Sequence, residues 1–286
     1  MINLFRWFYC LFAVIVLASP AMADRELPKP GEVTKYYSGN KKYEVGVIER
    51  TITDGPAKMI FSADGKQLWE KNLTSTPGAV HVSNDGQYIV LANWGWADEG
   101  GYKSLSFYKG TGDLIKEVGL CSISMLNGKL GTQMKWLRNP TLSADGQRYA
   151  FGENQKQGEK PKITMYSVPQ AQLLWEKNIG AGDYFRLWMS KDGSFLLLSS
   201  YSLKCQHTKN DMVGEYDECK PKDAMFTYFD GNGTVIWEKS IVDGFQGQDE
   251  LAELNEDGLQ FKIYDATAKK WVEYVNQGGK VLPKNP

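Results

Sequence analysis

The sequence has few of the residues that build metal sites. Its 286 residues include four cysteines and two histidines, with no Cys-x-x-Cys pair and no Asp-x-Asp-x-Asp loop. Zinc in proteins is held by closely spaced cysteine and histidine, and calcium loops use closely spaced carboxylates. The sequence therefore predicts no metal site. Gly-x-Ser-x-Gly and phosphate-binding loops are also missing, so these signatures of an enzyme are not found.

An excess of either charge is missing as well. The chain carries 33 basic and 34 acidic side chains, and no stretch gathers the basic ones into a stripe. Binding to nucleic acid depends on clustered Lys and Arg facing phosphates. We therefore expect no nucleic-acid partner.

Long apolar runs are absent after the first 23 residues. The start resembles a secretory signal peptide, with an apolar run from Leu11 to Ala18 followed by Ala21-Met22-Ala23. The alternative is an uncleaved anchor, because residues 4–23 are nearly long enough to span a bilayer of about 30 Å. Pro20 and the small-residue pattern favour cleavage after residue 23. We expect a secreted or periplasmic protein in which residues 24–286 form one domain without a membrane span.

Cysteine is scarce, and its placement predicts one bond. Cys10 leaves with the leader, and Cys205 and Cys219 share one polar stretch. In an oxidising compartment we expect these two to form a disulfide worth about 3 kcal/mol. Cys121 is then left over, either buried and inert, or reactive, or paired with another chain. The inert state is favoured because unpaired cysteine packs readily as a small apolar residue.

What the chain does have is a repeat. An apolar-apolar-charge-charge run recurs as Leu68-Trp69-Glu70-Lys71, Leu114-Ile115-Lys116-Glu117, Leu174-Trp175-Glu176-Lys177 and Ile236-Trp237-Glu238-Lys239, and more faintly as Val281-Leu282-Pro283-Lys284. A second signature alternates with it: VSNDGQYIVLAN from Val82, LSADGQRYAFGEN from Leu142, MSKDGSFLLLSS from Met189 and LNEDGLQFKIYD from Leu254, with a degenerate copy from Tyr37. Asp-Gly between strands is a strong hairpin signal, because glycine adopts the positive φ of a tight turn. Each repeat is therefore predicted to contain two hairpins, or four antiparallel strands.

A fixed period of four strands is typical of a β-propeller. Runs such as YIVLANW are apolar at every alternate position on both faces, as expected for sheets covered on both sides. We predict an all-β, five-bladed propeller with blades at about 33–73, 78–118, 136–178, 184–240 and 249–282. Trp-Glu-Lys then falls on the outer strand, where we expect Trp to fill the gap between blades, and Glu and Lys to protect the exposed edge.

Two motifs resemble known propeller repeats. Gly65-Lys66-Gln67-Leu68-Trp69 resembles the Gly-Lys-x-Leu-Trp element of pyrroloquinoline-quinone-like (PQQ-like) repeats, and Ser83 to Tyr88 resembles the Ser-x-Asp-Gly-x-Tyr hairpin of WD40-like repeats. The resemblance covers most of the mature chain and implies the propeller architecture. Quinone-dependent dehydrogenases of the first family are larger, with eight blades and an adjacent Cys-Cys pair. This chain has neither, so no cofactor is expected.

Candidate binding residues fall in the longer connections. Insertions occur between strands at 93–101, 119–135, 155–160 and 202–223, all expected on one face of the propeller. In the first of them, Trp94 and Trp96 flank a glycine and precede Asp98 and Glu99. Exposed aromatics of this kind stack on sugar rings or anchor protein partners. The alternative is that both rings pack against neighbouring loops.

The innermost strands supply a second set of candidates. The equivalent positions two residues before the Ser or Asn of each hairpin hold Tyr36, His81, Thr141, Trp188 and Glu253. We interpret these as the lining of a central channel, in which His81 and Glu253 are either an acid–base pair or mutual hydrogen-bond partners. A filled polar core is the favoured alternative. Arg138 and Arg186 are expected nearer the insertion-bearing ends of their strands.

The sequence thus favours a non-catalytic propeller that binds a protein or a glycan through its insertion-bearing face, and it leaves the oligomeric state open. The alternative is a propeller enzyme, such as a glycoside hydrolase or lyase, with its active site at the central channel. Glycoside hydrolysis needs two carboxylates about 5 to 9 Å apart on opposite walls. Asp249 and Glu250 come from one blade, which argues against that class.

Overall fold

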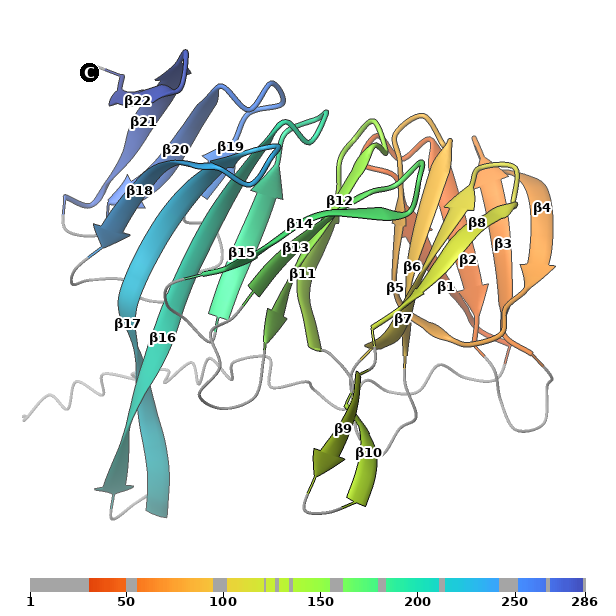
Figure 1. Cartoon of the computed structure of the whole chain (residues 1–286), viewed down its shortest axis with the longest axis horizontal. Coiled ribbons are helices and arrows are strands. Elements are labelled where there is room, and N and C mark those ends of the chain that lie inside the picture. The colour runs from red at the N-terminus through yellow and green to blue at the C-terminus, as the bar shows by residue number, and fades with distance from the viewer. Residues whose placement is uncertain are drawn as a thin grey trace, which may run out of the picture.

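The computed structural model describes residues 31–49, 56–94, 102–120, 122–126, 129–133, 136–154, 162–179, 184–210, 214–241, 252–265 and 268–284. Every regular element within these ranges is a β-strand (Figure 1). None of the described residues forms a helix long and apolar enough to cross a bilayer. The predicted leader, residues 1–23, lies outside the described residues, as does Cys121.

Five sheets of four strands follow one another along the chain, each strand pairing antiparallel with the next. The first sheet contains β1 (Val33–Tyr37), β2 (Tyr43–Ile48), β3 (Lys58–Ala63) and β4 (Lys66–Asn72). The second contains β5 (Pro77–Val82), β6 (Tyr88–Trp94), β7 (Tyr102–Lys109) and β8 (Leu114–Gly119). The third contains β11 (Trp136–Leu142), β12 (Arg148–Asn154), β13 (Lys162–Ser167) and β14 (Gln172–Asn178). The two hairpins predicted for each repeat are thus present in these sheets.

The fourth sheet contains β15 (Tyr184–Met189), β16 (Phe195–Asn210), β17 (Gly214–Asp230) and β18 (Val235–Ile241). The fifth contains β19 (Ala252–Leu254), β20 (Gln260–Asp265), β21 (Lys270–Gln277) and β22 (Lys280–Pro283). A separate hairpin of β9 (Ser122–Leu126) and β10 (Lys129–Gln133) connects the second sheet to the third.

In the second to fifth sheets the Asp-Gly turn of the second signature joins the first two strands, and a serine holds this turn closed in three of them. In the second sheet the Ser83 hydroxyl donates to Asp85 Oδ1 at 2.6 Å and accepts from the Tyr88 amide at 3.0 Å. The third and fourth sheets repeat both bonds at Ser143 and Ser190. These residues therefore form the turn that their pattern predicts.

Neighbouring turns are hydrogen-bonded to one another in a chain that we call the turn belt. The Asn40 amide donates to Asn84 Oδ1 at 3.0 Å. Further backbone bonds run from Asn84 to Ala144 at 2.8 Å, from Asp145 to Lys191 at 3.0 Å and from Lys191 to Glu256 at 2.7 Å. Because each bond crosses from one sheet to the next, all five sheets are joined at the ends that carry these turns.

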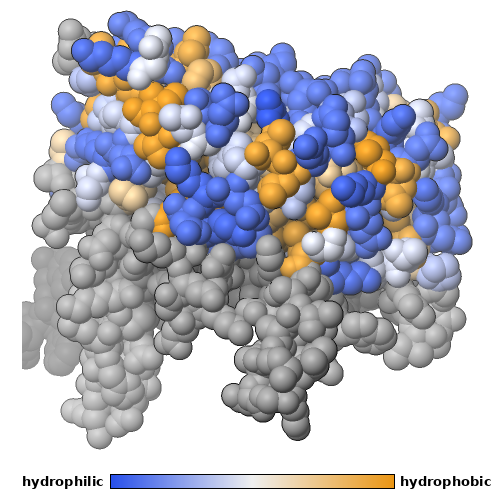
Figure 2. Space-filling view, in the orientation of Figure 1, coloured by the Kyte–Doolittle hydropathy of each residue, from blue (hydrophilic) through white to orange (hydrophobic). Residues whose placement is uncertain are grey.

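Apolar side chains fill the spaces between the sheets in four clusters. Phe61 of the first sheet and Leu91 of the second share one cluster, and each is 1% exposed. Val90, which precedes Leu91 and points to the opposite face of the sheet, belongs to the cluster that faces the third sheet. The second sheet is therefore covered on both faces, as its apolar run predicts. On the side seen in Figure 2 the described surface is mainly hydrophilic, with smaller hydrophobic patches.

The Trp-Glu-Lys run links one sheet to the next. In β4, Trp69 Nε1 donates to the Gly110 carbonyl in the β7–β8 turn at 2.7 Å, and Lys71 Nζ donates to the Gly112 carbonyl at 3.0 Å. The same run in β14 makes both contacts with the β17–β18 turn, at 3.0 and 2.7 Å. The prediction that the tryptophan packs between sheets is confirmed. The lysine, predicted to protect an open edge, binds the next sheet instead.

The row of sheets does not close into a ring. The first and fifth sheets lie at opposite ends in Figure 1, and the extensive contacts between sheets join sequence neighbours within the described residues. Ion pairs cover the outward faces of the end sheets: Lys35–Glu44 and Lys58–Glu70 on the first, Lys262–Glu253 and Lys284–Glu273 on the fifth. Polar outer faces of this kind are typical of the terminal units of a stacked repeat.

Candidate binding face

The two ends of the sheets differ in what they carry. The Asp-Gly turns and the turns between third and fourth strands share one end, which we call the turn face. The opposite ends of the strands, from which the second-to-third connections and the links between sheets leave, form what we call the insertion face. From it project β9–β10 and the outer part of β16–β17 (Figure 1).

The segment 202–223 was predicted as an irregular insertion, and this is wrong. β16 and β17 pair through it from Ser202 opposite Lys222 to Asn210 opposite Gly214, after a register shift between Ser200 and Ser202. Its polar composition and its proline favour a loop. The two strands are already aligned inside the fourth sheet, however, so that their ladder continues outward without a new nucleus.

Three of the predicted binding residues lie on strands near the insertion face. Trp94 is the last residue of β6 and pairs with Tyr102. Arg138 pairs with Gly152, and Arg186, which is half-buried, pairs with Ser199. Trp96, Asp98 and Glu99 lie outside the described residues.

The other three candidates lie toward the turn face. His81, Trp188 and Glu253 hold equivalent register positions, opposite Val90, Leu197 and Lys262. Each comes two residues before the serine or asparagine that starts its turn. Trp188 packs against the cluster between the fourth and fifth sheets. Arg186 and Trp188 are only two residues apart on β15, so the six described candidates are spread along the strands of several sheets and are not gathered at the insertion face.

His81 and Glu253 do not pair with one another. Glu253 Oε2 lies 2.8 Å from Lys262 Nζ within its own sheet. The His81 ring lies against Tyr149 of the third sheet, edge to face, with the ring centroids 5.5 Å apart. Although His81 keeps some exposed surface, its Nε2 atom is buried and lacks a hydrogen-bond partner, and so does the Tyr149 hydroxyl.

The electrostatics of His81 follow from this position. Burial lowers the pKa of the imidazole to about 4, because the charged form is poorly solvated there. Burial also raises the pKa of Tyr149 well above its ordinary value. Both side chains are therefore neutral at physiological pH, which suits an interior contact between two sheets better than a proton-transferring pair.

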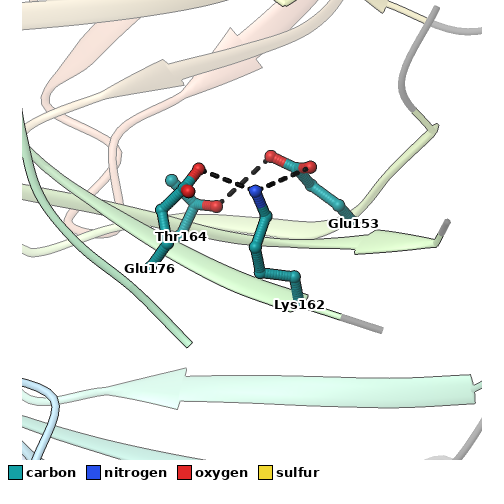
Figure 3. Close-up of polar contacts among 4 residues, drawn as sticks. All are labelled: Glu153, Lys162, Thr164 and Glu176. Carbon is teal, nitrogen blue, oxygen red and sulfur yellow. Dashed lines mark hydrogen bonds and ion pairs between the residues drawn. The ribbon is translucent and has the colours of Figure 1, made fainter. Parts of the chain in front are cut away.

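Polar side chains that the sequence did not single out as a group form a network near the insertion face (Figure 3). Lys162 Nζ lies 2.8 Å from Glu176 Oε1 and 3.7 Å from Glu153 Oε2. The Thr164 hydroxyl donates to Glu153 Oε1 at 3.2 Å. The side chain of Glu153 is only 2% exposed, so its charge depends on these contacts.

The second sheet has a counterpart of this network in which amide and hydroxyl groups take the place of the lysine. Asn93 Nδ2 donates to Ser104 and Ser106 at 3.0 and 2.7 Å, and Ser104 donates to Glu117 Oε1 at 2.6 Å. Glu117 comes from the same outer strand of its sheet as Glu176 does in the third. The acidic residue recurring in the outer strands was the sequence signal for this layer. Each of the two networks joins side chains from three strands near the insertion face.

Within the described part of the chain, no three His, Cys, Asp or Glu side chains come close enough to hold a metal ion. Glu117, Glu153 and Glu176 instead contact neighbouring Lys, Thr and Ser side chains.

Comparison with known proteins identifies the architecture. No protein-family model matches the chain, and no curated protein matches it. Among solved structures, the complex of KlAtg21 with the coiled coil of AgAtg16 is similar over 88% of this chain and 68% of that chain, at 10% identity and a TM-score of 0.52. The hydrazine synthase of Kuenenia stuttgartiensis is similar over 84% of this chain, at 9% identity and a TM-score of 0.48.

The β-propeller domain of the trilobed protease from Pyrococcus furiosus is also similar, over 88% of this chain and 71% of that chain, at 10% identity and a TM-score of 0.46. The chain spans 63% of the hydrazine synthase chain. Likeness at this level of identity concerns the fold alone. The chain has the fold of a β-propeller, built from five four-stranded antiparallel blades in an open row.

Proposed function

We propose that this chain is an exported, non-catalytic propeller that binds a protein partner through its insertion face. One observation carries the proposal: two projections of paired strands, β9–β10 and the outer part of β16–β17, leave the same end of the molecule. Projecting segments on a rigid scaffold are the usual carriers of recognition.

The opposite end supports the same choice. At the turn face the turn belt already uses backbone groups of Asn84, Asp145 and Lys191 for contacts between sheets. Groups that hold the scaffold together are not free for a partner without loss of stability. The insertion face has no such restriction along the outer part of β16–β17, which pairs only with itself in the described chain.

A protein partner is favoured over a glycan by the kind of surface. A two-stranded projection offers backbone edges and a long side-chain surface, which suit strand addition or packing against a partner's elements. The solved propeller KlAtg21 was captured with a coiled coil, which illustrates a protein partner on this fold. A glycan, stacked on Trp94 and Trp96, is the competing outcome of the experiment below.

Affinity capture from the native envelope or culture medium tests the proposal. The bait is the chain with residues 202–223 replaced by an Asn-Gly turn, compared with the unaltered chain. The matched control carries Gln87→Lys and Asn232→Lys, two exposed positions on the turn face. We expect the shortened chain to lose the partner and the control to keep it. Equal capture by both, or loss only with the control, would contradict the proposal.

A second bait separates the protein from the glycan. Replacing Trp94 and Trp96 with alanine removes the stacking rings and leaves β16–β17 intact. Capture that survives this change but not the shortened ribbon supports a protein partner. Binding to immobilised glycans that is lost with the tryptophans, and kept without the ribbon, would replace it with the glycan.

Export is the other half of the proposal. It rests on the signal-peptide pattern of residues 1–23. The chain recovered from the envelope or the medium is expected to begin at Asp24. A chain that keeps Met1 and stays with the cytosol would refute export without touching the binding face.

A further inference from the structure

The outer part of the fourth sheet brings two cysteines into register. We call this part, residues 202–210 paired with 214–222, the ribbon. Within it Cys205 is the Cα partner of Cys219, between the pairs Lys204–Lys220 and Gln206–Glu218. The sequence shows only that both cysteines share one polar segment, and it leaves their alignment undetermined.

This register meets the geometric conditions for a bond. Directly opposite residues of an antiparallel pair have Cα atoms about 4.5 to 5.5 Å apart. Disulfides join cysteines whose Cα atoms are about 4.4 to 6.8 Å apart. Opposite positions also share one face of a ribbon, and a shift of one residue would put the two cysteines on different faces.

We propose that Cys205 and Cys219 form a cross-strand disulfide that fixes the register of the ribbon. The two thiols lose two protons and two electrons to a disulfide oxidant, either oxidised glutathione or the disulfide form of a thiol–disulfide oxidoreductase of the exporting compartment. That oxidant is reduced to two thiols while one S–S bond forms. The reaction in the living cell rests on the proposed export, whereas the pairing itself does not.

The pattern of pairs along the ribbon explains what the bond does. Lys204 lies opposite Lys220, and like charges directly opposite one another destabilise a strand pair. The ribbon is two-stranded beyond the sheet, and isolated hairpins are marginally stable in water. Toward its tip Lys209 lies opposite Glu215, a favourable pair. A covalent link beside the two lysines offsets the repulsion at the point where the ribbon leaves the fourth sheet.

The consequence for binding is a recognition arm with one register. A one-residue slip in a ribbon moves every side chain to the other face. With the disulfide in place, the side chains presented to a partner are fixed. On reduction the ribbon gains freedom, whereas the five sheets keep their core clusters and turn belt.

Mass spectrometry of the oxidised protein tests the pairing. The full chain is purified under reducing conditions, exposed to oxidised glutathione, alkylated, and digested without reduction. We expect one peptide pair joined through Cys205 and Cys219, two hydrogens lighter than the sum of its parts, and alkylated Cys121. Alkylation of both ribbon cysteines, or a link from either of them to Cys121, would overturn the proposal.

Amide hydrogen exchange tests whether the disulfide holds the ribbon in one register. Reduction of the wild-type chain is expected to speed exchange in 202–222 and to leave β11–β14 unchanged. The variant Cys205→Ser with Cys219→Ser should exchange at the fast rate under both conditions, which controls for effects of the reductant elsewhere. A ribbon that exchanges equally slowly in the reduced chain would show that the bond does not fix it.

The outcome in the cell is separate. A chain that links Cys205 to Cys219 in glutathione but is recovered from the cytosol with both thiols free would refute export and retain the pairing. A chain recovered from an oxidising compartment with the ribbon thiols free would overturn the pairing.

Discussion

Replacing Gly146 with alanine is expected to destabilise the propeller through the contact between two sheets. Gly146 has φ of 74°, and a Cβ built on it would lie 2.7 Å from Ser83 Cβ and 2.8 Å from Tyr88 Cδ2 in the preceding sheet. Gly65 has nearly the same φ, 76°, with nothing within 4 Å of its Cβ position. The two glycines therefore share the backbone requirement and differ in what surrounds them.

The difference sets the magnitudes. An alanine in the left-handed region costs about 1 to 2 kcal/mol, which is the whole effect expected of Gly65→Ala. Forcing a methyl group into a packed contact adds about 1 to 3 kcal/mol. The free energy of unfolding should therefore fall by about 2 to 5 kcal/mol in Gly146→Ala.

Urea denaturation, followed by tryptophan fluorescence and by circular dichroism, measures both variants. Coincident transitions and equal m-values are needed before the two free energies are compared. The reasoning would be refuted if the two variants lost the same free energy to within about 0.5 kcal/mol, since the contact with the preceding sheet would then contribute nothing.

Of three further predictions, two concern charges and one concerns the open row of sheets. The pKa of His81 is about 4 in the fold against an ordinary 6.5, so between these pH values the unfolded chain binds a proton that the folded chain does not. The free energy of unfolding of the wild type should therefore fall by about 3 kcal/mol more than that of His81→Leu as the pH drops from 7 to 4. Urea denaturation of both proteins at the two pH values measures this difference. Lys162→Met should lower the free energy of unfolding by about 3 kcal/mol, because it removes the cation that faces the buried Glu153 carboxylate. Lys58→Met removes one partner of an exposed ion pair and should lower it by less than about 1 kcal/mol. Equal losses of stability in thermal unfolding would contradict the burial argument. Cysteines placed at Glu44 and Lys262 should not be joined by a short bifunctional maleimide at protein concentrations too low for contact between chains, and efficient cross-linking within one chain would show that the end sheets meet.

Much of the fold was predictable because its signals are local. The Asp-Gly turns fix where each hairpin reverses, and runs such as YIVLANW fix which sheets are covered on both faces. The open row was harder to predict, since the repeats alone give the number of sheets and not whether the last meets the first. Single residues distinguish an end sheet from an inner one. Glu44 holds the position after its turn that the buried Ile89 holds in the second sheet, so this face of the first sheet is polar and not covered by a neighbouring sheet.

The candidate site was less predictable, for reasons that follow from the strand geometry. His81 was grouped with Glu253 because both hold the same place in the repeat. Equivalent places lie in different sheets, however, and His81 packs against Tyr149 whereas Glu253 pairs with Lys262. Polar residues dominate the ribbon, so its sequence predicts a loop. A strand pair that projects from its sheet packs against no core, and its sequence therefore lacks the apolar alternation by which strands are recognised. The network around Glu153 depends on side chains from three strands, which no single segment reveals.

Amide hydrogen exchange of the chain, free and bound to its captured partner, tests the central claim most directly. We predict slower exchange in β9–β10 and in the ribbon, with no change in the turns at 83–87 and 143–147. Protection centred on those turns, or on the outward faces of the first and fifth sheets, would contradict recognition through the insertion face.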